Sequence, residues 1–209
     1  MLLHIHPDNP RPSHIQTVID CLSCGGVIIY PTDTIYGLGC DINNRKAVER
    51  IAQIKGINID KANLSLICYD LSNISDYTRQ ISNSAYKLMK KVLPGPYTIV
   101  LNANNNVPKL FQSKKKTVGI RVPDNNIARS IVHEFGRPIV STSIRAFNEE
   151  IEENEYLTDP ELIHEKFFNL VDIVIDGGYG DNNASTVVDC TDEEFKVLRY
   201  GKGSIDEFL

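Results

Sequence analysis

The sequence lacks any long apolar run. No stretch of its 209 residues approaches the roughly 18 consecutive apolar residues that span a bilayer. The opening residues MLLHIHPDNP also lack the basic segment and apolar stretch of a secretory signal. These absences predict a cytoplasmic protein with no membrane partner. With 42% hydrophobic and 23% charged residues, the chain is expected to form a single globular domain over residues 1–209.

A paired set of cysteines is also missing. The number of cysteines is odd and their positions are scattered, which argues against a disulfide framework and favours reduced thiols; they are Cys21, Cys24, Cys40, Cys68 and Cys190. Cys21 and Cys24 form a CxxC pair, but no second pair or histidine pair follows at the spacing of zinc ligands. The sequence therefore predicts no metal site.

Acidic residues are absent between Tyr77 and Pro123, where nine Lys or Arg residues occur. The reverse holds between Ala146 and Glu165, with eight acidic residues and no Lys or Arg. Such asymmetry favours one face that attracts anions and another that faces solvent. Chance clustering of surface charges explains the pattern equally well, so charge alone does not decide between the two interpretations.

Hydrophobic periodicity predicts strands and helices that interleave without strict alternation. This order is typical of an α/β (α+β) protein with a twisted mixed β-sheet flanked by helices. The expected strands are 2–5, 27–30, 64–68, 97–101, 117–122, 139–141, 171–175, 186–189 and 196–198. The expected helices are one N-capped by Ser13 and ended by Gly25-Gly26, 44–55, 82–92, 126–135, and 160–169 with Asp159 as N-cap. Residues 31–34 are interpreted as a polar loop, and Gly37 and Gly39, which follow it, are expected to let backbone amides approach a ligand closely.

No strand is followed by a GxGxxG or GxxxxGK[ST] sequence, which removes the main support for a dinucleotide or P-loop site. Six other strings carry the functional signal, and each alone is compatible with an ordinary turn or strand end. They are YPTDTIYGLGCD (30–41), KG (55–56), LPGP (93–96), TVGIRVP (117–123), STS (141–143) and STVVD (185–189). In this order they resemble the YrdC/YciO family of threonylcarbamoyl-AMP synthases over about residues 25–201.

The resemblance implies a YrdC-like fold with a concave, positively charged face. It implies condensation of L-threonine, bicarbonate and ATP, which enters with Mg²⁺, to threonylcarbamoyl-AMP and pyrophosphate for tRNA modification. Positioning and positive electrostatics would drive this reaction without a covalent enzyme intermediate, so no catalytic residue is assigned. It also implies an affinity for double-stranded RNA or tRNA.

Carried over position by position, the resemblance assigns three groups of residues. The ATP-binding residues would be Lys55, Thr117, Ser143 and Arg199. The threonine-binding residues would be Thr32, Tyr36, Arg121, Ser141 and Ser185, with the Arg121 guanidinium clamping the threonine carboxylate. The basic segment would supply RNA-binding residues Lys114, Lys115 and Lys116.

The sequence departs from the synthase pattern in several places, one of which is residues 63–69, where the histidine of the family's PLIVHV strand has no counterpart. The arginines of the family's KGRPRDKP segment are replaced by Ile57 and Ile59, and the asparagine of its STSAN loop by Arg145. These departures resemble the YciO branch. Each lost charge-assisted hydrogen bond contributes roughly 1.5–3 kcal/mol, so two losses predict activity lower by roughly two to four decades. We hypothesise that Arg145 replaces part of the missing charge. An RNA-binding protein without turnover, or a hydrolase or carbamoyl-handling enzyme on the same scaffold, are the alternatives.

Overall fold

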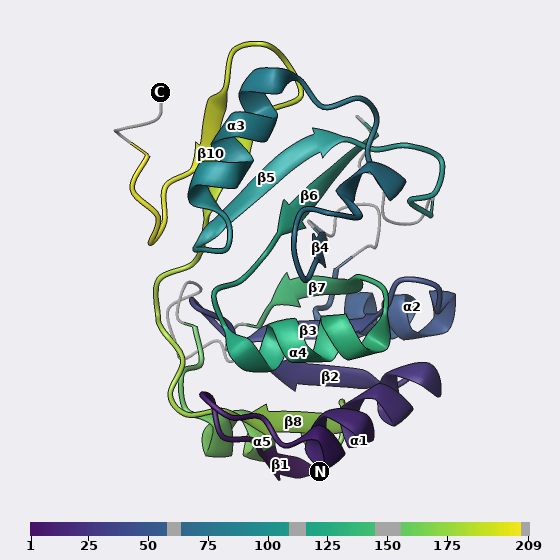
Figure 1. Ribbon diagram of the computed structural model, residues 1–209. Coiled ribbons are helices and arrows are strands. Elements are labelled where there is room, and N and C mark those ends of the chain that lie inside the picture. The colour runs from purple at the N-terminus through teal and green to yellow at the C-terminus, as the bar shows by residue number, and fades with distance from the viewer. Residues whose placement is uncertain (58–63, 109–115, 145–155, 206–209) are drawn as a thin grey trace.

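The computed structural model describes residues 1–57, 64–108, 116–144 and 156–205. In this part of the chain ten strands form one mixed sheet in the order β1-β8-β2-β3-β7-β4-β6-β5-β9-β10 (Figure 1). The strands are β1 (Leu2–His4), β2 (Val27–Tyr30), β3 (Gly37–Asp41), β4 (Ser65–Ile67), β5 (Tyr97–Asn102), β6 (Thr117–Arg121), β7 (Ile139–Ser143), β8 (Ile173–Asp176), β9 (Thr186–Asp189) and β10 (Lys196–Arg199). The predicted mixed sheet is confirmed.

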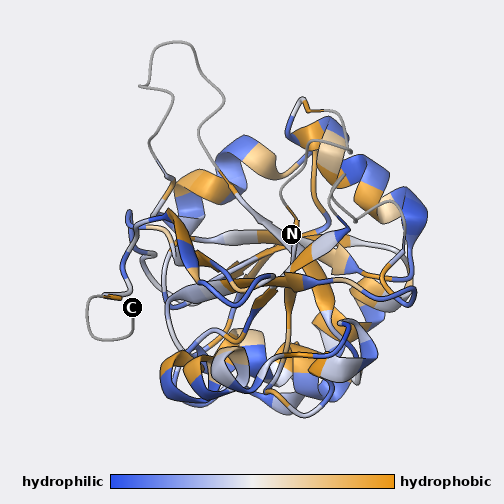
Figure 2. Cartoon of the chain, turned by 90° about the horizontal axis from the view of Figure 1, so that it is seen from above, coloured by the Kyte–Doolittle hydropathy of each residue, from blue (hydrophilic) through white to orange (hydrophobic). Residues whose placement is uncertain are grey.

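Among the described residues, five α-helices and one short 3₁₀ helix flank the sheet: α1 (Pro12–Ser23), α2 (Arg45–Ile54), η2 (Ile74–Asp76), α3 (Asn83–Val92), α4 (Asn126–Phe135) and α5 (Pro160–Phe167). Helices α1 and α4 pack on one sheet face, against Ile28, Tyr30 and Ile139. Apolar residues of α2, α3 and α5 join the larger core on the other face. Seen from above, the strands cross the middle of the molecule and the helices surround them (Figure 2). None of the described helices is long and apolar enough to cross a membrane.

One part of the sheet is not covered by a described helix. Residues paired directly across strands share a face, and the pairs Gly39–Ser141, Ser141–Ser65, Ser65–Gly119 and Gly119–Val100 therefore place these side chains on the face that also carries Tyr30 and Arg121. We call this the open face. Along β5 the residues on this face are half-buried, whereas the alternate residues are buried. Ser65, Val100 and Gly119 are half-buried, so solvent reaches this surface along β4, β5 and β6, whereas Tyr30, Arg121 and Ser141 are buried.

Strand β3 is absent from the strands expected from the sequence. The two glycines of β3 have low strand propensity, so the sequence did not predict a strand here. Strand β3 nevertheless lies inside the sheet, between β2 and β7. A Cβ added at Gly39 would lie 2.9 Å from Cε1 of Tyr30 and 3.0 Å from the Val140 carbonyl oxygen. The glycines therefore make room for the Tyr30 ring. The prediction that Gly37 and Gly39 admit a ligand is wrong, because both pair with strands on either side.

Helix starts were predicted with mixed success. Asp159 accepts hydrogen bonds from the first turn of α5, which confirms the predicted N-cap. Helix α1 instead begins at Pro12, with Arg11 at the N-cap position and no side-chain cap, so the assignment of Ser13 is wrong. Proline suits the first helical turn because that position needs no N–H donor.

Replacing Gly39 with alanine is expected to lower the free energy of unfolding by about 1–3 kcal/mol, because the new methyl group overpacks the Tyr30 ring and a backbone carbonyl. Urea unfolding measures this change. Gly119→Ala is the matched control, since its Cβ would meet only side-chain carbons of Thr98 and Ser65 at 3.1 and 3.2 Å. Equal losses in the two variants would contradict the role given to Tyr30.

Candidate functional site

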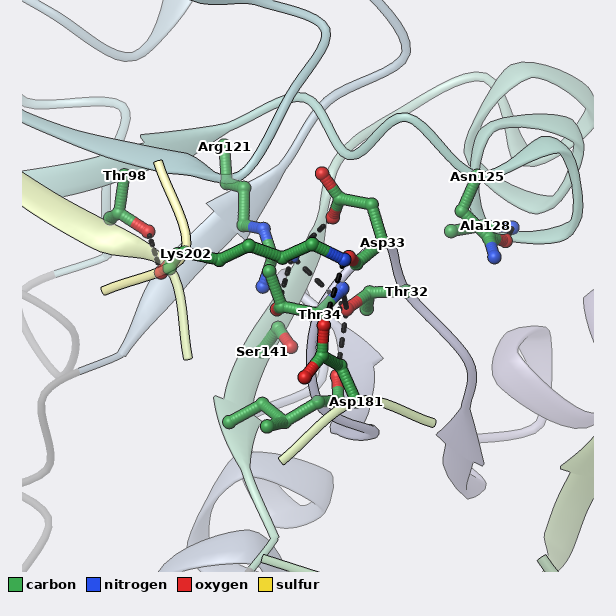
Figure 3. A network of polar contacts seen from close by, with 12 residues as sticks. Thr32, Asp33, Thr34, Thr98, Arg121, Asn125, Ala128, Ser141, Asp181 and Lys202 are labelled. Carbon is green, nitrogen blue, oxygen red and sulfur yellow. Dashed lines mark hydrogen bonds and ion pairs between the residues drawn. The ribbon is translucent and has the colours of Figure 1, made fainter. Parts of the chain in front are cut away.

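Arg121 is held by the loop that follows β2. Its Nη2 donates hydrogen bonds to Thr32 Oγ1 (3.0 Å), Asp33 Oδ1 (2.5 Å) and Thr34 Oγ1 (2.7 Å), as Figure 3 shows. Pro31 ends the strand and starts this loop, so three consecutive polar side chains meet one guanidinium. Arg121 is only 7% exposed. The predicted pair of Thr32 and Arg121 is therefore brought together, with Asp33 and Thr34 added to it.

Two atoms of this cluster lack partners. Asp33 Oδ2 and Arg121 Nε are both buried and make no hydrogen bond with any described residue. Buried polar atoms are usually satisfied, since leaving one unpaired costs about 1–3 kcal/mol. The cluster thus keeps one spare acceptor and one spare donor, which is the pattern expected of a site that a polar ligand completes.

Tyr30 and Ser141 form the next contact on the open face. The Tyr30 hydroxyl donates to Ser141 Oγ over 2.6 Å, across strands β2, β3 and β7. Burial raises the pKa of Tyr30 to about 12, so this hydroxyl stays protonated and acts as the donor at neutral pH. Ser141 then keeps its own proton for another acceptor.

Lys55 lies at the end of α2 and reaches the end of β7. Its Nζ donates to the Ser143 carbonyl oxygen (2.7 Å) and to Thr142 Oγ1 (3.2 Å). Two predicted ATP-binding residues, Lys55 and Ser143, are therefore in direct contact at the rim of the open face. Thr117 begins β6 on the same face as Arg121, four positions before it, and is half-buried.

Ser185 and Arg199 also meet. Arg199 donates from Nη2 (2.8 Å) and Nε (3.1 Å) to the Ser185 carbonyl oxygen, and Nη2 lies 3.1 Å from Ser185 Oγ. The same hydroxyl lies 2.9 Å from Thr98 Oγ1. A predicted threonine-binding residue and a predicted ATP-binding residue are thus joined on the open face, beside β5.

Tyr36 is the predicted threonine-binding residue that lies apart from these contacts. Its side chain belongs to the core on the opposite face, and its hydroxyl donates to the Gly178 carbonyl oxygen over 2.6 Å. Burial raises the pKa of Tyr36 well above its usual value. The ring packs against Gly180, so Tyr36 supports the glycine-rich loop after β8. Its contact with threonine stays a prediction.

A cavity of about 550 Å³ adjoins the Arg121 cluster. The Thr32–Thr34 loop lines one side, and Thr158, Tyr179–Asn182 and Lys202 line the rest. Lys202 Nζ donates to the Asp33 carbonyl oxygen and pairs with Asp181 Oδ2, each over 2.8 Å (Figure 3). The hydrogen bond from Lys202 holds the pKa of Asp181 below its usual value. The lining therefore carries charges of both signs.

A family model described as telomere recombination, and named for Sua5, YciO and YrdC, matches residues 20–201. The chain belongs to this family. YciO of Escherichia coli, described as an uncharacterized protein, is 42% identical over 207 residues, which are 99% of this chain and 98% of YciO. The crystal structure of E. coli YciO matches with a TM-score of 0.91 and covers 100% of this chain and 99% of that one.

Relatives with a described activity or ligand are more distant. A threonylcarbamoyl-AMP synthase of Vibrio vulnificus is 38% identical over 133 residues, which are 63% of this chain and 71% of the synthase. The crystal structure of P. abyssi Sua5 complexed with L-threonine matches with a TM-score of 0.88 at 27% identity, covering 99% of this chain and 59% of that chain. The predicted family and YrdC-like fold are confirmed.

Some predicted features of this family member fall outside the described residues. These are Lys114, Lys115, Ile59 and the hypothesis on Arg145. Ile57 is described and is 37% exposed. Lys116 is exposed and directly precedes β6.

Three described lysines of the basic segment lie away from the open face, which carries Arg121 of the same segment. Lys87, Lys90 and Lys91 are exposed on α3, which packs on the opposite sheet face from Arg121. The RNA-binding role of residues 114–116 and the positive charge of the concave face stay predictions.

Four residues of the site were missed by sequence reasoning: Asp33, Thr34, Asp181 and Lys202. Asp33 could have been found, since it is the charged member of the PTDT string. Lys202 is 169 positions from Asp33 and Asp181 stands in a polar turn, so neither carries a local signal.

Proposed function

We propose that this protein binds ATP and L-threonine on the open face and converts them with bicarbonate to threonylcarbamoyl-AMP and pyrophosphate. One observation carries the proposal: residues from four separate strings of the sequence lie on the open face, and Lys55, from a fifth string, contacts the end of β7. The contacts are those of Arg121 with the Thr32–Thr34 loop, Tyr30 with Ser141, Lys55 with Ser143, and Arg199 with Ser185. The complex of P. abyssi Sua5 with L-threonine supports a threonine site on this fold.

Arg121 would bind the threonine carboxylate, since its fork of donors suits a planar anion. Ser141 and Ser185 would orient the amino acid from the two sides of Arg121 along the sheet. Lys55 would contact the ATP phosphates, which carry Mg²⁺ into the site as part of the substrate. Ser143, Thr117 and Arg199 would position the nucleotide.

In the reaction, the neutral amine nitrogen of threonine first forms a bond to the carbon of bicarbonate. The C–OH bond of bicarbonate breaks, and its hydroxide leaves as water with a proton from the amine, which gives a carbamate. A carbamate oxygen then forms a bond to the α-phosphorus of ATP, while the bond from that phosphorus to the bridging oxygen breaks and pyrophosphate leaves. Both partners are anions, so the protein's contribution is to hold them together beside Lys55 and Arg121. The exposed Ile57 stands where the family pattern has an arginine, so we expect slow turnover.

The test is pyrophosphate release measured with each substrate omitted in turn. We expect release that requires both threonine and bicarbonate, with threonine and radiolabelled bicarbonate carbon incorporated into an AMP adduct. Release without threonine would indicate a hydrolase or another carbamoyl-handling enzyme and would refute the proposal. No release of pyrophosphate, together with salt-sensitive retention on duplex RNA, would favour the second candidate function, an RNA-binding protein. The basic run that includes residues 114–116 supports this second candidate.

A further inference from the structure

The carboxylate of Asp33 already forms an ion pair with Arg121, the arginine that would bind the substrate carboxylate in the proposed function. The side chains of Arg121 and Asp33 are 9% and 10% exposed, so this ion pair is largely shielded from water. All three hydrogen bonds that the guanidinium donates to described residues leave from one nitrogen, Nη2, toward the Thr32–Thr34 loop. A substrate carboxylate that binds two nitrogens of the fork must therefore share Nη2 with Asp33 or displace it.

The charges of the cluster make this sharing selective. Arg121 and Asp33 together are neutral, so a simple carboxylate would leave one negative charge without a partner in a poorly solvated site. The carboxylates of Asp33 and of the ligand would share one guanidinium, and two such negative charges repel strongly where water is excluded. An α-amino acid brings its own ammonium group, so the ligand and the Arg121–Asp33 pair together carry two positive and two negative charges.

The two unpartnered atoms fit such a ligand. Arg121 Nε is a spare donor for a carboxylate, and Asp33 Oδ2 is a spare acceptor for an ammonium group. Asp33 is one of the residues that line the cavity, although its Oδ2 is itself buried. The other charges on the cavity, Asp181 and Lys202, neutralise each other.

We propose that Asp33 is a specificity-determining residue that makes the Arg121 site selective for zwitterionic α-amino acids over carboxylates without an amino group. The inference rests on the proposed threonine site and adds Asp33 to it. Asp33 would accept a hydrogen bond from the α-ammonium group before the amine loses a proton and reacts.

The test compares L-threonine with 3-hydroxybutyrate, which is threonine without its α-amino group, by calorimetric titration. The parent protein is expected to prefer threonine by at least roughly tenfold. In Asp33→Asn the preference should fall by about tenfold or more, because 3-hydroxybutyrate gains affinity while the threonine ammonium loses its charged acceptor. Asp41→Asn is the matched control, since it neutralises a carboxylate that is equally shielded and paired with an arginine, Arg137, but does not line the cavity. Its preference should equal that of the parent.

Two results would overturn the inference. Equal binding of threonine and 3-hydroxybutyrate to the parent protein would do so without any variant. An Asp33→Asn protein that loses affinity for both compounds in the same proportion would show that Asp33 merely orients Arg121.

Failure of the proposed function gives a different result. Glycine against acetate and serine against 3-hydroxypropionate are titrated in the same way. Selective binding of another amino acid, lost in Asp33→Asn, would support the role of Asp33 while refuting threonine as the substrate. If the parent binds no amino acid of this set, the inference falls with the site, whatever the pyrophosphate assay shows.

Discussion

Replacing Arg121 with methionine is expected to abolish detectable threonine binding and to lower the free energy of unfolding by about 3–5 kcal/mol. Methionine keeps much of the side-chain volume but removes the charge and all donors. Asp33 would then be a buried carboxylate without its cation, and the Thr32 and Thr34 hydroxyls would lose their shared donor. Calorimetric titration with threonine and urea unfolding measure the two effects.

The double variant Arg121→Met with Asp33→Asn separates stability from binding. Neutralising Asp33 removes the uncompensated charge, so most of the lost unfolding free energy should return. Threonine binding should not return, because the ligand carboxylate still lacks its guanidinium. Threonine affinity retained in either variant would exclude Arg121 as the carboxylate site.

Replacing Lys55 with alanine is expected to slow threonine-dependent pyrophosphate release by roughly one to two decades. Lys55 is the half-buried cation at the rim of the open face, and one charge-assisted hydrogen bond to a phosphate contributes about 1.5–3 kcal/mol. Its present contacts, with the Ser143 carbonyl and the Thr142 hydroxyl, hold Nζ at the end of β7. The initial rate at saturating threonine, measured over a range of ATP concentrations, gives the effect.

Lys46→Ala is the control for this variant, since Lys46 is an exposed lysine on the same helix. Its rate should match that of the parent, whereas Lys55→Arg should recover part of the loss because the positive charge is kept. A Lys55→Ala rate within twofold of the parent would remove Lys55 from the proposed ATP site. Urea unfolding of Lys55→Ala shows whether the contact with β7 also contributes to stability.

The helices and most strands were predictable because their signals are local. Apolar residues recur at helical spacing in α2, α3 and α4. The helix expected over residues 126–135 has the same bounds as the observed helix α4, Asn126–Phe135. Strand β3 was not predictable from propensity, because Gly37 and Gly39 are unfavourable in strands. The Tyr30 ring from the neighbouring strand fills the space above them and compensates for this.

The sequence by itself determined the family, the mixed sheet and most of the site strings, because periodicity and short motifs depend on residues that are neighbours in the chain. Only the tertiary structure decided how those strings contact one another. Strand register turned Arg121 and Ser141 to the open face and Tyr36 to the opposite core. The ion pair of Asp33 with Arg121 joins residues 88 positions apart. The hydrogen bond from Lys202 to the Asp33 carbonyl oxygen joins residues 169 positions apart. Such contacts exist only once packing brings distant segments together.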